Sequence, residues 1–184
     1  MQTDQNTEAG SPAVFLDRDG VLTEERGYVA SIEELHIFPY VRECVWQIHQ
    51  KGYYAIVITN QSGVARGLFT EKALLEMNVY LMQQTGVDAV YYCPHHPEGK
   101  MKKYKKECRC RKPGIGMFQE ACRKFDIDLA SSYMVGDRAG DILAGQNAGI
   151  KTILLESGYG TVRLEAEVEP DYICRDLKDV MNIL

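Results

Sequence analysis

The chain lacks the features of exported, membrane-spanning and general nucleic-acid-binding proteins. Its 184 residues contain no uninterrupted apolar run close to the roughly 20 residues that a membrane-spanning helix needs. Residues 1–12 are polar and have neither the basic start nor the apolar core of a secretory signal. Basic residues number 21 and acidic residues 26, so the net charge is −5 and no broad basic surface is available for a phosphate backbone. We therefore expect a cytoplasmic protein with neither a membrane nor a nucleic-acid partner.

The length and composition fit one ordinary globular domain. A chain of this size buries on the order of 70% of its unfolded surface, which is enough for one well-filled core. Apolar residues make up 45% and charged residues 26% of the chain, as in most soluble proteins. We expect a flexible tail over residues 1–12 and a single domain over residues 13–184, acting as a monomer on a small molecule.

Short apolar runs alternate with amphipathic segments along the chain. The runs are rich in β-branched residues and end at polar or turn-forming residues, as buried strands do. Predicted strands cover 14–16, 54–58, 89–92, 133–135, 152–155 and 172–174, and predicted helices cover 39–51, 70–85, 115–125, 139–148 and a segment from 176. Such alternation predicts an α/β fold with a Rossmann-like, doubly wound parallel sheet.

Core positions follow from the same patterns. The helix that begins near Pro39 places Val41, Val45, Trp46 and Ile48 on or near one face. A further set of residues on predicted helices or a strand is expected in the core, namely Cys44, Cys122 and Cys174.

Polar residues follow several of the predicted strands. Asp17 and Asp19 come directly after the first strand, and Gly20 lets the chain turn there. Thr59, Asn60, Arg111, Lys112, Asp137 and Asp141 lie at other strand ends or in the loops beside them. Each of these alone is typical of a turn, a helix cap or a solvated side chain. Because the carboxyl ends of parallel strands meet at one edge of the sheet, together they predict one site.

This set of residues suits attack on a phosphate monoester. A phosphomonoester carries about two negative charges near neutral pH, so a carboxylate can attack it only if a cation and a lysine reduce the repulsion. Asp17 and Asp137 offer the hard oxygen ligands that Mg²⁺ prefers. Asp17 would then attack phosphorus, while Asp19 protonates the leaving alkoxide and later activates water.

A loop over residues 93–110 carries a second group of metal-ligand residues. Cys93 and His95 form one close pair, and Cys108 and Cys110 form another. Three thiolates and one imidazole suit a closed, structural Zn²⁺ site that would hold Arg111 and Lys112 toward the first site. Replacement of His95 by His96, or buried free cysteines without metal, are the alternatives.

The motifs resemble those of the haloacid dehalogenase superfamily of phosphatases. The resemblance rests on residues 17–20, on Thr59 with Asn60, on Lys112 with Pro113, and on residues 136–138 with Asp141. It implies a nucleophile at Asp17, a general acid/base at Asp19, and phosphate contacts from Thr59 and Lys112. It implies Mg²⁺ bound by Asp17, Asp137 and the backbone carbonyl of Asp19. The role of Asp141, as a metal neighbour or a hydrogen-bond support, stays open. No insertion is long enough for a cap domain.

The zinc-type loop narrows the resemblance to two groups within this superfamily, phosphatases of D-glycero-D-manno-heptose 1,7-bisphosphate and of histidinol phosphate. The first group is favoured by the run 60–67 and by Tyr91 to Pro97, and implies removal of the 7-phosphate. The implied substrate contacts are Glu25, Arg26, Gly27, Tyr28, Thr59, Asn60, Gln61, Ser62, Arg111, Lys112 and Arg138. Arg111 would recognise the second phosphate. An alternative of another class is a zinc-loop protein that binds nucleic acid through its lysines.

Overall fold

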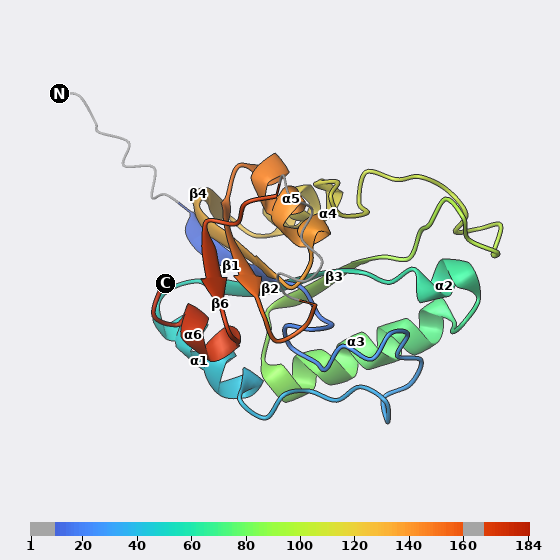
Figure 1. The fold of residues 1–184 in the computed structure, drawn as a ribbon, viewed down its shortest axis with the longest axis horizontal. Helices are drawn as coiled ribbons and strands as arrows, with labels where there is room; N and C mark the ends of the chain where they lie inside the picture. Colours follow the sequence, from blue (N-terminus) through green and yellow to red (C-terminus); the bar gives the residue numbers. More distant parts are fainter. Residues whose placement is uncertain (1–9, 160–167) are drawn as a thin grey trace.

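A six-stranded parallel sheet with helices on both faces forms the body of the protein (Figure 1). The computed structural model describes residues 10–159 and 168–184. The strand order is β3-β2-β1-β4-β5-β6. The strands are β1 (Ser11–Leu16), β2 (Tyr54–Asn60), β3 (Ala89–Cys93), β4 (Ile127–Gly136), β5 (Lys151–Leu155) and β6 (Tyr172–Cys174). The helices are α1 (Val41–Gln50), α2 (Gly63–Arg66), α3 (Glu71–Thr85), α4 (Gly116–Lys124), α5 (Ala139–Ala148) and α6 (Leu177–Val180). The predicted α/β fold class is confirmed.

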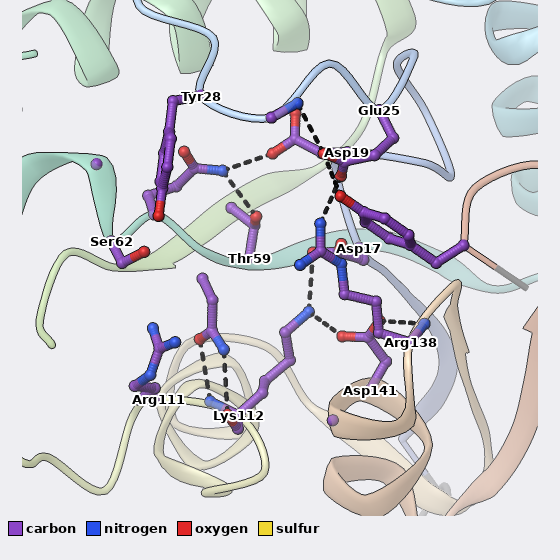
Figure 2. Close-up of a pocket in the computed structure, with 16 residues that line it drawn as sticks. Asp17, Asp19, Glu25, Tyr28, Thr59, Ser62, Arg111, Lys112, Arg138 and Asp141 are labelled. Carbon is purple, nitrogen blue, oxygen red and sulfur yellow. Dashed lines mark hydrogen bonds and ion pairs between the residues drawn. The ribbon is translucent and has the colours of Figure 1, made fainter. Parts of the chain in front are cut away.

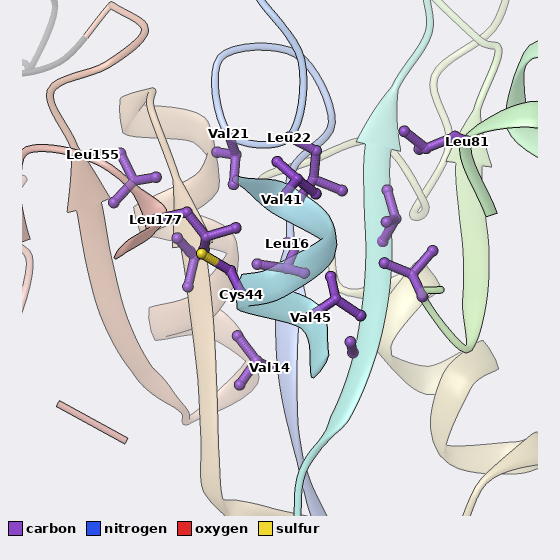
Figure 3. Packing of buried hydrophobic residues seen from close by; sticks show 14 of the residues in the cluster. Val14, Leu16, Val21, Leu22, Val41, Cys44, Val45, Leu81, Leu155 and Leu177 are labelled. Atoms are coloured by element: carbon purple, nitrogen blue, oxygen red, sulfur yellow. The ribbon is translucent and has the colours of Figure 1, made fainter. Parts of the chain in front are cut away.

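The two faces of the sheet bury separate apolar layers. Alternate residues of β1 point to opposite faces, so Val14 and Leu16 join one layer while Phe15 joins the other. Helices α1, α3 and α6 cover the first layer, part of which is drawn in Figure 3, and α4 and α5 cover the second. Burial on both faces explains why the strands are continuous apolar runs.

On helix α1 the prediction of the buried face was correct for three residues and wrong for Trp46. Val41, Val45 and Ile48 are buried, as predicted, and Cys44 lies with them. Trp46 is instead 55% exposed, because it lies one residue beyond Val45 and so turns about 100° away from the buried stripe. Among the other cysteines, Cys174 is buried and Cys122 only partly so.

Strands β1 and β4 extend furthest beyond the predicted ranges. Strand β1 begins at Ser11, inside the segment predicted as a tail, because Ser11 pairs with Ile127 of β4. Strand β4 is correspondingly longer than predicted and its register shifts relative to β1. The side chain of Ser132 accepts a hydrogen bond from the backbone of Ala13 at 2.9 Å and so provides a partner at the shift. The rest of the predicted tail, residues 1–9, lies outside the described residues.

The arrangement of β1 and its neighbours positions a site. The chain proceeds from β1 outward to β2 and β3 on one side, then returns to place β4 on the other side of β1. In parallel α/β sheets, ligands bind at the carboxyl ends of the strands where the order reverses in this way. Within the described ranges no helix is both long and apolar enough to cross a membrane.

Candidate active site

A cavity of about 380 Å³ opens at the carboxyl edge of the sheet (Figure 2). Its walls come from the loops after β1, β2, β3, β4 and β5. The lining residues are Asp17, Asp19, Glu25, Gly27, Tyr28, Thr59, Asn60, Gln61, Ser62, Gly63, Arg111, Lys112, Arg138, Gly140, Asp141 and Tyr159. The structure therefore brings together the polar residues that were predicted to meet at this edge.

Lys112 is the central cation of the site. Its Nζ lies 2.8 Å from Asp17 Oδ1 and 2.6 Å from Asp141 Oδ1, and it also donates to the backbone carbonyl of Ile58 at 2.8 Å. All three charged side chains are buried, and Figure 2 shows the lysine reaching from the floor of the cavity to Asp17. Burial strengthens these charge-assisted contacts, and loss of any one partner would leave an uncompensated charge.

Asp137 provides a buried carboxylate beneath the cavity. Its Oδ2 accepts a hydrogen bond from the backbone of Tyr159 at 2.9 Å. Its Oδ1 is buried, has no hydrogen-bond partner among the described residues, and lies 4.0 Å from Arg138 Nε. Carboxylate oxygens of Asp17, Asp137 and Asp141 lie within 4.8 Å of one another. Burial, followed by the charge of Asp17, raises the pKa of Asp137 to about 7. A hard divalent cation such as Mg²⁺ fits this oxygen cluster.

The turn after β1 passes very close to Asp137. Gly20 has a positive φ of 89°, and a Cβ at that position would lie 2.4 Å from Asp137 Oδ2. Only glycine permits this approach, which keeps the Asp19 segment and Asp137 side by side.

Asp19 is held by donors around both of its oxygens. Arg18 makes a bidentate interaction with Asp19, in which Nε lies 3.0 Å from Oδ1 and Nη2 lies 3.0 Å from Oδ2. Gln61 Nε2 donates to Oδ2 at 2.8 Å and Thr23 Oγ1 donates to Oδ1 at 3.2 Å. Arg18 is 1% exposed, which is rare for an arginine. The residue between the two predicted catalytic aspartates therefore fixes the second of them.

The last residue of β2, Asn60, holds the backbone of Lys112. Asn60 Nδ2 donates to the carbonyl of Lys112 at 3.1 Å, and Asn60 Oδ1 accepts from its N–H at 3.0 Å. Thr59 Oγ1 accepts a hydrogen bond from Gln61 Nε2 at 3.0 Å. The amide side chain predicted at this strand end thus joins the end of β2 to Lys112.

One side of the cavity rim is closed by Glu25, Arg138 and Tyr159. Glu25 Oε2 lies 2.6 Å from Arg138 Nη2, and Glu25 Oε1 accepts from Tyr159 Oη at 3.4 Å. The guanidinium of Arg138 stacks 4.2 Å from the centre of the Tyr159 ring. Tyr159 was missed at the sequence level, although a signal existed, because it follows β5 and the residues after any parallel strand reach this edge.

The predicted substrate contacts fall into two groups. All but one of them line the cavity. Arg26 is the exception, because its guanidinium turns outward to His36 at 3.0 Å and to Glu24 at 3.5 Å. Arg111, which is predicted to bind the second phosphate, lines the cavity and donates a hydrogen bond to the backbone carbonyl of His95 at 3.4 Å.

Three of the four predicted zinc ligands meet in the loop after β3. The ligand atoms of Cys93, His95 and Cys108 lie within 4.8 Å of one another, with the two sulfur atoms 3.3 Å apart. Cys110 is not one of these three, and a Cβ added at Gly116 would lie 2.8 Å from its sulfur. Burial and the neighbouring Cys108 raise the pKa of the Cys110 thiol, so Cys110 lies close to one member of the group. His96 instead contacts Arg66. Soft thiolates with an imidazole are a donor set that suits Zn²⁺.

Comparisons with known proteins agree with this geometry. A family model described as HAD-hydrolase-like matches residues 109–180. The D-glycero-beta-D-manno-heptose-1,7-bisphosphate 7-phosphatase of Haemophilus ducreyi is 42% identical over 178 residues, covering 94% of this chain and 97% of that protein. The protein of the same name from Photorhabdus laumondii is 40% identical over 93% of this chain and 94% of its own length.

A solved structure is similar over the same extent. The crystal structure of D,D-heptose 1,7-bisphosphate phosphatase from B. bronchiseptica, complexed with magnesium and phosphate, superposes with a TM-score of 0.79 at 33% identity. The match covers 94% of this chain and 97% of that one.

Proposed function

The chain belongs to the haloacid dehalogenase-like hydrolases, and from this premise we propose that it removes the 7-phosphate of D-glycero-β-D-manno-heptose 1,7-bisphosphate. The observation that carries the proposal is the meeting of Asp17, Asp19 and Lys112 at one cavity. Relatives that share 40% or more of their residues over nearly the whole chain act, by name, on this bisphosphate. The β anomer follows from those names.

In the first half-reaction Asp17 attacks the phosphorus atom. A bond forms between its carboxylate oxygen and phosphorus, and the bond from phosphorus to the sugar oxygen breaks. Asp19 gives its proton to the departing alkoxide. Lys112, beside Asp17, offsets the charge on the phosphoryl oxygens.

In the second half-reaction Asp19 removes a proton from water, and this water attacks the aspartyl-phosphate. Inorganic phosphate leaves and Asp17 is restored. The four donors around Asp19 orient it, and Gln61 links it to Thr59, which we place against the phosphoryl group.

We place Mg²⁺ against Asp17, Asp137 and the carbonyl of Asp19. When bound there it would supply positive charge to the phosphoryl group in transfer. The buried Oδ1 of Asp137, which accepts no hydrogen bond from the described residues, supports this position. Asp141 is assigned a supporting role, because Lys112 contacts its Oδ1 at 2.6 Å and the backbone N–H of Arg138 donates to its Oδ2 at 3.1 Å.

The substrate is tested by steady-state phosphate release with Mg²⁺. We expect kcat/KM for the β-bisphosphate to exceed that for histidinol phosphate by about a hundredfold or more, which corresponds to about 2.7 kcal/mol. The α anomer, measured in parallel, tests the anomer assignment. A preference for histidinol phosphate would overturn the proposed substrate while leaving the residue roles to be tested separately.

We further propose that Zn²⁺ binds at Cys93, His95, Cys108 and Cys110 and stabilises the loop that carries Arg111 and Lys112. Replacement of Cys108 by serine should reduce the zinc content from about one per chain to nearly none, because a hydroxyl is a poor substitute for a thiolate. Elemental analysis of purified protein measures this, with Cys122→Ser as the matched control that keeps its zinc.

Two results would change the zinc assignment. Full zinc content in Cys108→Ser would remove this residue from the ligand set. Full zinc content in Cys110→Ser would likewise remove Cys110 from the ligand set.

A further inference from the structure

A cluster of cationic and N–H donor groups lies beside the cavity and has no part in the reaction described above. Arg66 is the last residue of α2, the short helix that begins at the cavity-lining Gly63. Its Nη2 lies 3.3 Å from Nε2 of His96. Arg111 lines the cavity, and the charges of both arginines act on the His96 imidazole. Ser62 and Arg111 lie on the same side of the cavity in Figure 2.

The hydrogen bonds of His96 show that its contact with Arg66 joins two donors. The backbone N–H of Glu98 donates to His96 Nδ1 at 3.1 Å, so Nδ1 is an acceptor. In a neutral ring the hydrogen must then be on Nε2. A guanidinium has donors only. The 3.3 Å contact therefore places two N–H groups next to each other without an acceptor, an arrangement that suits a shared anionic ligand.

The charge balance of the arginines leads to the same conclusion. Five arginines in the described ranges have a carboxylate within 4.0 Å, namely Arg18, Arg26, Arg123, Arg138 and Arg175. Among the described residues Arg42, Arg66, Arg109 and Arg111 have no such partner, and of these four it is Arg66 and Arg111 whose charges act on His96. In that same part of the chain, Arg66 Nε is buried and has no hydrogen-bond partner. Two uncompensated guanidinium groups next to one imidazole form a local positive site in an acidic protein.

Close packing holds these groups in place. The backbone N–H of Met101 donates to the carbonyl of Ala65 at 2.9 Å, which joins the loop after β3 to α2. At Gly99 an added Cβ would lie 2.9 Å from the Ala65 carbonyl oxygen, so only glycine allows this approach. His96 and Arg66 are thus positioned by backbone contacts on both sides.

We infer that Arg66 and His96, together with Arg111, bind the phosphate group that is not transferred. This inference rests on the proposed function, because it requires a substrate with a second phosphate. A terminal phosphate dianion has three acceptor oxygens, which match the fork of a guanidinium and an imidazole N–H. The occupant is therefore the 1-phosphate of the sugar, held on the Ser62 side while the 7-phosphate lies at Asp17.

The test compares substrates with and without the 1-phosphate. For Arg66→Met we expect the ratio of kcat/KM for heptose 1,7-bisphosphate to that for heptose 7-phosphate to fall on the order of ten- to a hundredfold, as for loss of a charge-assisted contact. The dissociation constant of heptose 1-phosphate, the product, should rise by a similar factor in calorimetry. Arg123→Met, an arginine on α4 that is 62% exposed and paired with Glu120, should leave both values unchanged.

Second variants keep the inference testable if Arg66→Met does not fold. Arg66→Lys retains the positive charge but not the paired N–H donors of the guanidinium. Its ratio of kcat/KM for the bisphosphate to that for heptose 7-phosphate should lie between those of the wild type and Arg66→Met. His96→Gln retains an N–H donor, and should bind heptose 1-phosphate more tightly than His96→Leu does.

Two outcomes would overturn the inference: an unchanged ratio with unchanged product binding, or an equal loss on both substrates in folded Arg66 variants. The wild-type protein tests the proposed function separately, because a wild type without preference for the bisphosphate would overturn that function whatever the variants do.

Discussion

Replacement of Asp17 by asparagine is expected to lower kcat by about 10⁴-fold or more, because the amide cannot form the aspartyl-phosphate. The fold should survive. Lys112 would keep its ion pair with Asp141 at 2.6 Å, and the asparagine oxygen could still accept a hydrogen bond from Nζ. Removal of one buried carboxylate also reduces the repulsion with Asp137, which is one cause of that residue's raised pKa.

The measurement is phosphate release alongside a denaturant-unfolding curve. The matched control is Asp128→Asn on β4, which makes the same chemical change away from the cavity and should keep both values near wild type. An Asp17→Asn protein that retained more than about one hundredth of the wild-type rate would contradict a covalent mechanism.

Replacement of Lys112 by methionine is expected to lower both activity and stability. The side chain is 2% exposed and lies within 2.8 Å of two buried carboxylates. Methionine would fill much of the same space but leave Asp17 and Asp141 without their cation. Breaking a buried pair in this way typically costs about 3–5 kcal/mol in the free energy of unfolding. Activity should fall as well, because the phosphoryl oxygens lose a positive charge.

A second replacement separates the two effects. Adding Asp141→Asn to Lys112→Met removes one uncompensated charge, so the free energy of unfolding should recover in part while kcat stays low. Unfolding curves and phosphate release for the single and double variants measure this. Lys72→Met, on the exposed face of α3, is the control. A single variant as stable as the wild type would show that the buried charges are compensated in another way.

The order of strands and helices was predictable because strands buried on both sheet faces are continuous apolar runs in the sequence. The apolar run of β2 indicates a buried strand. The start of α3 is indicated by Thr70, which caps the helix by accepting a hydrogen bond from the N–H of Ala73. The register shift in β4 was not predictable from a local pattern, because it involves a hydrogen bond between Ser132 and the backbone of Ala13, which are 119 positions apart. Long-range side-chain to backbone bonds have no local periodicity.

The candidate site was predictable where a residue type and a strand end coincide. Asp17, Thr59 and Lys112 meet as expected. The direction of a side chain within a loop was not predictable. Arg26 turns out to His36, although its neighbours Glu25 and Gly27 line the cavity. A loop has no fixed angle per residue, so spacing alone does not decide which side chains converge.

The position of β1 in the sheet also affects how the protein is made. Strand β1 is translated first among the strands, yet one of its two edges pairs with β4, whose Tyr133 faces Val14. On the ribosome that edge has no native partner until β4 has emerged, and closing so distant a contact is slow. An unpaired apolar edge is a template for association between chains. The strand that leads to Asp17, the proposed nucleophile, is therefore expected to need protection from association with other chains during synthesis.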